Sequence, residues 1–197
     1  MYSHKQRGFT LVELLITIIM VGVVSTIFLT AFKSTIFNYL NMQQDASATT
    51  QINTEAYRLA TAVRSATDIN SATSNDLVLY AYFYPSDTYV SLLHYYLSTD
   101  SKGTHLMADL TPMTANPPAG TAITDKKRTF TIIDSFYTGG GKPLFEYLNA
   151  GGNTLSLPIT DLQTIKGIRI NLAAKGSNGS NQSLNVDVSL RNKKTNL

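Results

Sequence analysis

The feature that most constrains this chain is a long apolar segment near its start, which runs from Phe9 to Phe32. The segment is 24 residues long, and Glu13 is its only charged residue. As an α-helix it would be about 36 Å long, which is enough to cross a hydrocarbon core of roughly 30 Å. The sequence therefore predicts a membrane-spanning helix over residues 9–32.

The charges on either side of this segment predict its orientation. Lys5 and Arg7 lie in the short stretch before it, and Lys33 follows it directly. Short basic stretches of this kind stay on the cytoplasmic side of a membrane. We therefore expect a single-pass protein of the cytoplasmic (inner) membrane. Its N-terminus would be cytoplasmic, and the residues from Lys33 onward would be exported.

Two simpler interpretations of the apolar segment compete with a specialised one. A secretory signal peptide has a shorter apolar region followed by small residues at a cleavage site, whereas Gly22 and Ser25 lie inside this segment. A plain membrane anchor explains the length but gives no reason for Glu13. Because a carboxylate in a membrane helix is costly and usually marks function, Glu13 is the first candidate functional residue.

The residues around Glu13 resemble a known processing signal. The class III signal of type IV pilins and type II secretion pseudopilins is similar, without gaps, to the basic leader followed by Gly8-Phe9-Thr10-Leu11-Val12-Glu13-Leu14-Leu15-Ile16. The resemblance implies that a prepilin peptidase cuts between Gly8 and Phe9 and then N-methylates Phe9. It also implies that Glu13 pairs with the N-terminal amine of a neighbouring subunit, which gives a buried carboxylate the partner it needs.

The same resemblance implies the partners and the location of the chain. The partners would be other pilin or pseudopilin subunits, an inner-membrane assembly platform and membrane lipid, and the final location an extracellular or periplasmic filament. Three features resemble the J-type minor pseudopilins and W-type minor pilins: the long segment after the helix, the ending Leu190-Arg191-Asn192 and the stretch 165–172. Because Glu13 is present, the extreme tip position, held in the family by subunits without this acid, is disfavoured.

Composition narrows the remaining function classes. The chain has 197 residues, no cysteine and a formal net charge of +3, of which Lys5 and Arg7 in the leader contribute two. The chain without its leader is therefore near +1, which gives no support for a nucleic-acid partner. The absence of cysteine excludes disulfides and thiolate metal sites.

No pattern in the sequence predicts an enzyme, a cofactor or a metal site. The histidines are His4, His94 and His105, and they lack the carboxylate spacing of a metal site or of a catalytic triad. A calcium site in the Asp, Asn and Gly-rich loops has no run of regularly spaced ligands to support it. We predict a protein without catalytic residues.

The rest of the chain predicts an α+β fold. Over residues 33–70 the helix should continue as an amphipathic segment, because apolar residues recur at helical spacing from Ile52 to Ala66. An antiparallel β-rich head is expected over residues 71–191, and a flexible tail over residues 192–197. We predict a sheet of six to eight strands, at residues 77–84, 88–97, 105–110, 128–136, 144–148, 154–157, 165–172 and 183–191.

Two surface features of the head have competing interpretations. Six tyrosines lie between Tyr80 and Tyr96 and would form either a ledge for a sugar, a base or another subunit, or a partly buried sheet face. The basic run Lys126-Lys127-Arg128 would be either a solvated loop or a contact for phosphate or an acidic partner. Two functions therefore stay open: a filament subunit, or a membrane-anchored binding or adhesion domain that does not polymerise.

Overall fold

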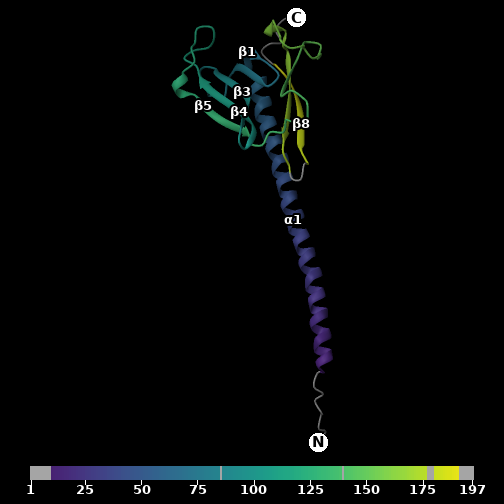
Figure 1. The fold of residues 1–197 in the computed structure, drawn as a ribbon. Helices are drawn as coiled ribbons and strands as arrows, with labels where there is room; N and C mark the ends of the chain where they lie inside the picture. Colours follow the sequence, from purple (N-terminus) through teal and green to yellow (C-terminus); the bar gives the residue numbers. More distant parts are fainter. Residues whose placement is uncertain (1–9, 85, 139, 177–179, 191–197) are drawn as a thin grey trace. The chain divides into compact units, whose positions relative to one another are not determined.

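The computed structural model describes residues 10–84, 86–138, 140–176 and 180–190. The elements, shown in Figure 1, are α1 (Leu11–Arg64), β1 (Ala66–Ala72), β2 (Asp76–Ala81), β3 (Ser91–Asp100), β4 (Gly103–Pro112), η1 (Thr124–Lys126), β5 (Arg128–Ile133), β6 (Phe145–Leu148), η2 (Leu162–Thr164), β7 (Gly167–Ala174) and β8 (Gln182–Ser189). The chain divides into two compact units, residues 1–43 and 44–197. The first part of α1 belongs to the first unit, and the last part of α1 belongs to the second, which we call the head.

The described strands of the head form two antiparallel sheets. The first has the order β1-β2-β3-β4-β5, so each strand lies beside its neighbour in sequence, and the second has the order β6-β7-β8. The predicted fold class, α+β with a long N-terminal helix packed on antiparallel β-structure, is confirmed. The expectation of a single sheet is wrong, since the strands divide between two.

The core of the head joins the last part of α1 to both sheets. The residues of α1 that are buried there share a helical spacing of three and four: Ala48, Ile52, Ala56, Leu59, Ala60 and Val63. They belong to one apolar cluster with Leu79 and Leu93 of the first sheet and with Ile168 and Ile170 of the second. The helix therefore supplies the surface on which both sheets are packed.

The helix ends earlier than predicted. We predicted that it continues to Asn70, whereas it ends at Arg64 and β1 begins at Ala66. Thr, Asp, Asn and Ser side chains compete for backbone hydrogen bonds and weaken helices. The Thr67 hydroxyl donates to the Tyr80 carbonyl at 3.1 Å, and Asp68 Oδ1 accepts the N–H of Ile69 at 2.9 Å. These local bonds favour the strand.

Several strand boundaries also differ from the prediction. The strand predicted at residues 77–84 ends at Ala81, and its partner begins only at Ser91. The short strand predicted at residues 105–110 is the ten-residue strand β4, paired on both sides. The strand predicted at residues 154–157 is reduced to an isolated bridge between Leu148 and Thr154. The leader 1–8 and the tail 192–197 lie outside the described residues.

Candidate processing and assembly site

The first turn of α1 positions Glu13. The backbone N–H of Glu13 donates to Thr10 Oγ1 at 3.3 Å, so Thr10 acts as the N-cap of the helix. Thr10 and Glu13 have the three-residue spacing of a capping box. A carboxylate in the first turn also interacts favourably with the positive end of the helix dipole. Glu13 therefore has a local structural role in addition to any role in assembly.

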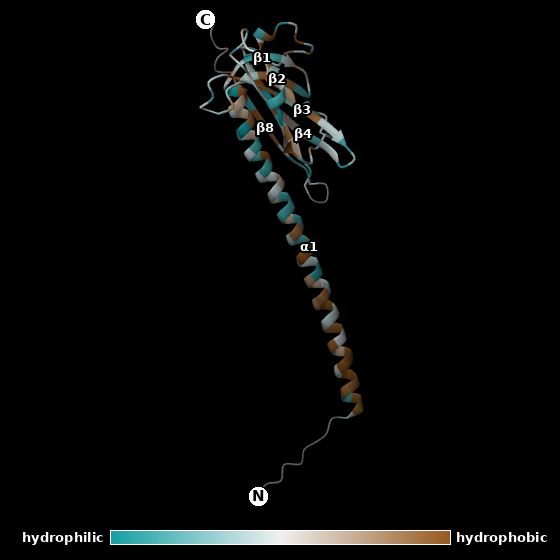
Figure 2. Cartoon of the chain, turned by 90° about the vertical axis from the view of Figure 1, so that its left-hand side faces the viewer, coloured by the Kyte–Doolittle hydropathy of each residue, from teal (hydrophilic) through white to brown (hydrophobic). Residues whose placement is uncertain are grey.

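Between Thr10 and Leu40, α1 has no face covered by the described residues of its own chain. Every described residue from Thr10 to Leu40 is exposed, although most of these side chains are apolar. Figure 2 shows the hydrophobic colour around the whole helix here rather than along one stripe. A helix that is apolar on all sides belongs in a membrane or among other helices. This segment must therefore be covered by something other than residues of its own chain.

The threonine hydroxyl groups from Thr17 to Thr35 are hydrogen-bonded within the helix. The hydroxyls of Thr17, Thr26 and Thr35 donate to the carbonyls of Leu14, Gly22 and Ala31 at 2.8–2.9 Å. Thr30 likewise donates to carbonyls of the preceding turn. Polar groups are tolerated in lipid when they are hydrogen-bonded internally. The Glu13 carboxylate, in contrast, has no partner among the described residues.

By length and composition, α1 qualifies to span a membrane near the N-terminus of the chain. Of the residues predicted to act in processing and orientation, Lys5, Arg7, Gly8 and Phe9 lie outside the described part of the structure. Glu13 lies within it, in the first turn of α1. The structure therefore describes Glu13, while its role in assembly and the cleavage site both stay predictions.

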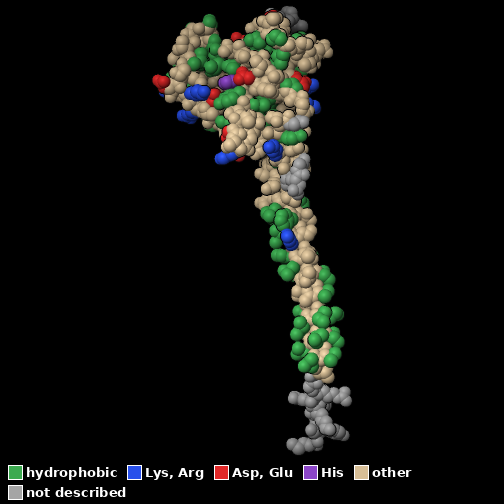
Figure 3. All heavy atoms as spheres, in the orientation of Figure 1, with side chains coloured by type: hydrophobic (Ala, Val, Ile, Leu, Met, Phe, Trp, Pro, Cys, Tyr) green, Lys and Arg blue, Asp and Glu red, His purple; other side chains and the backbone are tan. Residues whose placement is uncertain are grey.

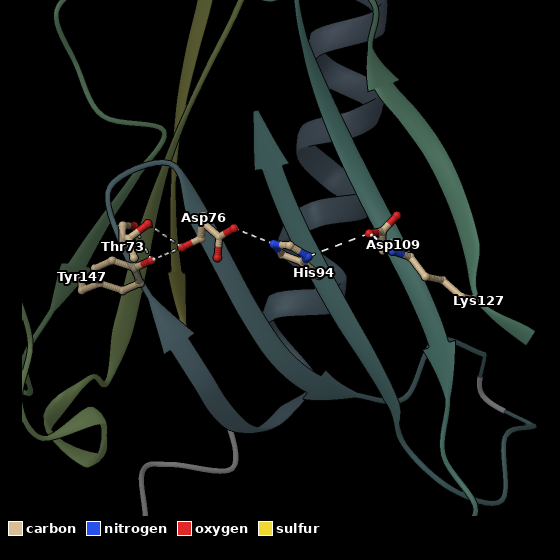
Figure 4. Close-up of polar contacts among 6 residues, drawn as sticks. All are labelled: Thr73, Asp76, His94, Asp109, Lys127 and Tyr147. Carbon is tan, nitrogen blue, oxygen red and sulfur yellow. Dashed lines mark hydrogen bonds and ion pairs between the residues drawn. The ribbon is translucent and has the colours of Figure 1, made fainter. Parts of the chain in front are cut away.

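A row of polar side chains crosses the first sheet, on the opposite face to the buried Leu93 and Tyr95. Figure 4 shows Asp76, His94, Asp109 and Lys127 in this row, with Tyr147 of β6 at its end, where the Tyr147 hydroxyl donates to the Thr73 carbonyl. His94 Nε2 contacts Asp76, and Lys127 Nζ lies 2.7 Å from Asp109 Oδ2. Sequence reasoning missed this row because its members come from separate strands.

The buried Asp109 is held ionised by its neighbours. Burial acts to raise its pKa, but hydrogen bonds from Lys127 and from the Thr129 hydroxyl, at 2.6 Å, outweigh it. The pKa of Asp109 therefore lies below its ordinary value, and the same hydrogen bond raises the pKa of Lys127. One residue of the basic run, Lys127, is therefore paired with Asp109 of the head.

His105 has a similar environment. Its Nε2 lies 3.0 Å from Asp100 Oδ1, and its Nδ1 lies 3.1 Å from Asp134 Oδ1. The hydrogen bond with Asp100 raises the pKa of His105 and lowers the pKa of Asp100. The two carboxylates contact opposite sides of the ring, so they do not converge on one ion. Within the described residues, no group of three or more His, Asp or Glu side chains is placed to hold a metal.

Comparison with known proteins identifies the N-terminal segment. The family model described as the prokaryotic N-terminal methylation motif matches residues 3–29. No curated protein and no solved structure matches the chain. The motif implies processing by a prepilin peptidase and assembly with other pilin subunits, and its family is structural rather than enzymatic. Residues 3–29 therefore identify the chain as carrying the class III signal of the type IV pilin and pseudopilin family.

Proposed function

We propose that this chain is a structural subunit, of the minor type, of a type IV pilus-like filament. A prepilin peptidase cuts between Gly8 and Phe9 and methylates the new N-terminus at Phe9. Lys5 and Arg7 keep that end in the cytoplasm, so the head is exported. The subunit then passes from lipid, through an inner-membrane assembly platform, into an extracellular or periplasmic filament.

One observation carries this proposal: the methylation motif leads directly into a helix whose apolar side chains are exposed on every side. A stable single-chain protein does not leave so large an apolar surface in water. Lipid covers it in the membrane, and the same segments of neighbouring subunits cover it in a filament. If this segment were part of an ordinary signal peptide, cleavage would remove it from the protein. A cut after Gly8 leaves the segment on the protein.

The geometry of the first turn supports a specific role for Glu13. Cleavage would create a positively charged amine at Phe9, four residues before Glu13. Four residues correspond to about 6 Å along a helix, so a parallel neighbour displaced by about 6 Å would place its amine beside this carboxylate. In an apolar surrounding, an ion pair of this kind stabilises only the correct axial register, because other displacements leave the carboxylate unpaired.

The minor type rests on a resemblance in sequence. The stretch 165–172, which includes most of β7, and the ending Leu190-Arg191-Asn192 resemble J-type and W-type minor subunits. No enzymatic activity forms part of the proposal. The competing function is a membrane-anchored domain that binds its target without polymerising, with Glu13 serving only as a first-turn acid.

Substitutions at Glu13 separate these two functions. Glu13→Gln removes the charge but keeps a polar side chain of similar size in the first turn, whereas Glu13→Ala removes both. We expect both variants to be cleaved normally and to be absent from filaments sheared from cells, as detected by immunoblot. The control Thr10→Ala removes the cap alone and should still be incorporated. Normal incorporation of Glu13→Gln would contradict the assembly role and leave only the capping role.

A further inference from the structure

The head contains an open cavity of about 570 Å³ that plays no part in the proposed assembly. It lies where three separate segments meet: the connection from β2 to β3, the end of β4, and η1 with the first residue of β5. The side chains that matter for its chemistry are Tyr84, Asp87, Tyr89, Asp125, Lys126 and Arg128. All of them belong to the same compact unit.

The walls of this cavity are held in place by hydrogen bonds between its loops. Asn116 Oδ1 accepts the N–H of Val90 at 2.9 Å, and Asn116 Nδ2 donates to the Tyr82 hydroxyl at 3.4 Å. Asp87 Oδ2 accepts the N–H of Tyr84 at 2.9 Å. The cavity therefore exists before any ligand binds, as is usual for small-molecule sites.

The lining combines aromatic faces with free cations. Tyr84 is 51% exposed and Tyr89 is 45% exposed, so both rings are accessible. Lys126 and Arg128 are exposed and form no ion pair within the described residues, whereas Lys127 is engaged by Asp109. Figure 3 shows Lys or Arg side chains close to Asp or Glu side chains on the flank of the head that carries β5.

The carboxylates of Asp87 and Asp125 in the lining favour a ligand with few negative charges over a nucleic acid. A nucleic acid would bring several phosphates beside Asp87 and Asp125, and like charges at short range repel. The chain without its leader is near +1, which gives only a weak electrostatic attraction for a polyanion. A ligand with one acidic group and several hydroxyls would use both kinds of charge, since its hydroxyls donate to carboxylates.

We propose that this cavity binds an acidic saccharide. The carboxylate of the sugar would be held by Arg128, whose planar guanidinium forms paired hydrogen bonds with carboxylates, and by Lys126. The hydroxyls of the sugar would donate to Asp125, and its apolar face would lie on the ring of Tyr84 or Tyr89. The cavity would then be an adhesive site displayed by each subunit.

The proposal rests on the proposed function only in placing the site on a filament, so the test uses the purified full chain in detergent micelles. Isothermal titration calorimetry would compare 3′-sialyllactose with lactose, and galacturonate with its methyl ester. We expect at least one acidic saccharide to bind about tenfold or more tightly than its neutral counterpart, because a hydrogen bond between charged groups is lost in the latter.

Two variants and two matched controls locate the binding. Arg128→Gln and Tyr89→Ala should each weaken the binding of the acidic saccharide about tenfold. Lys102→Gln and Tyr57→Ala change exposed residues outside the cavity and should leave it unaltered. Unaltered binding by Arg128→Gln, failure of both acidic saccharides to bind at millimolar concentration, or preferential binding of single-stranded dT12 would each overturn the proposal. Because no filament is needed, these results are independent of whether Glu13 acts in assembly.

Discussion

The two parts of α1 are one helix in two different environments. From Thr10 to Leu40 every described residue is exposed, and the side chains are apolar around the whole circumference. From Gln44 to Arg64 six apolar residues form a stripe that is buried in the core of the head, while the other faces are mostly polar and exposed. The same secondary structure is therefore stabilised by the chain itself in one part and requires outside partners in the other.

This difference separates the part of α1 that stabilises the head from the part that is available for contacts with lipid or other subunits. Substitutions in the buried part should act on the folding of the head, because its side chains contact both sheets. Substitutions in the exposed part should leave the head folded and alter only contacts with lipid or other subunits. A substitution in the exposed part that unfolds the head, or one in the buried part that leaves the head equally stable, would contradict this difference.

The largest expected effect comes from removing matched leucines in the two parts. Leu59 is 1% exposed and Leu29 is 64% exposed. Leu59→Ala should lower the free energy of unfolding of the head by about 2–5 kcal/mol, because it leaves a cavity in the core. Leu29→Ala should leave that free energy unchanged. Denaturant titration of the head, followed by far-ultraviolet circular dichroism in micelles, measures both, and equal effects would contradict the comparison.

How well the sequence predicts each element of this fold depends on how regular the spacing of its apolar residues is. The alternation in Leu184, Val186 and Val188 predicts β8 correctly, because one face is turned toward the core. The end of the helix is predicted wrongly because Ala66 and Ile69 continue the helical spacing, yet both are buried as strand residues. The length of β4 is missed at its two ends, because Gly103, Thr104, Thr111 and Pro112 give no apolar signal, although Thr111 is buried.

A smaller effect is expected at the link between the two sheets of the head. The Tyr147 hydroxyl donates to the Thr73 carbonyl at 2.7 Å, and burial raises the pKa of this phenol. Tyr147→Phe should lower the free energy of unfolding of the head by about 1 kcal/mol, the usual worth of one hydrogen bond. Binding of the chain to liposomes through the exposed part of α1 should not change. A loss of liposome binding would show that the two parts are coupled.

The smallest effect concerns pH and is again confined to the head. The pKa of His105 is raised in the folded state, chiefly by Asp100, so its stabilising effect is complete below its ordinary pKa of 6.5 and is lost as the pH rises through the folded value. Thermal unfolding of the head should therefore occur at slightly lower temperature at pH 8 than at pH 6. His105→Gln should remove this part of the pH dependence, and an unchanged profile in that variant would contradict the assignment.

The candidate sites differ in how visible they are in the sequence. Glu13 is predicted directly, because the motif and its spacing lie in one short stretch. The saccharide cavity is not, because Tyr84, Tyr89 and Arg128 come from segments that only the folding of the sheet brings together. The tyrosines are likewise divided by the fold, since Tyr95 is buried whereas Tyr84 and Tyr89 are accessible.

The central claim is that the exposed part of α1 is retained after a cut at Gly8 and becomes the assembly surface. The intact mass of the protein recovered from membranes or filaments tests this most directly. We predict a chain that has lost residues 1–8 and gained one methyl group, and Gly8→Leu should retain the leader. A mass that corresponds to the uncut chain, or to a cut within or after the apolar segment, would contradict the account.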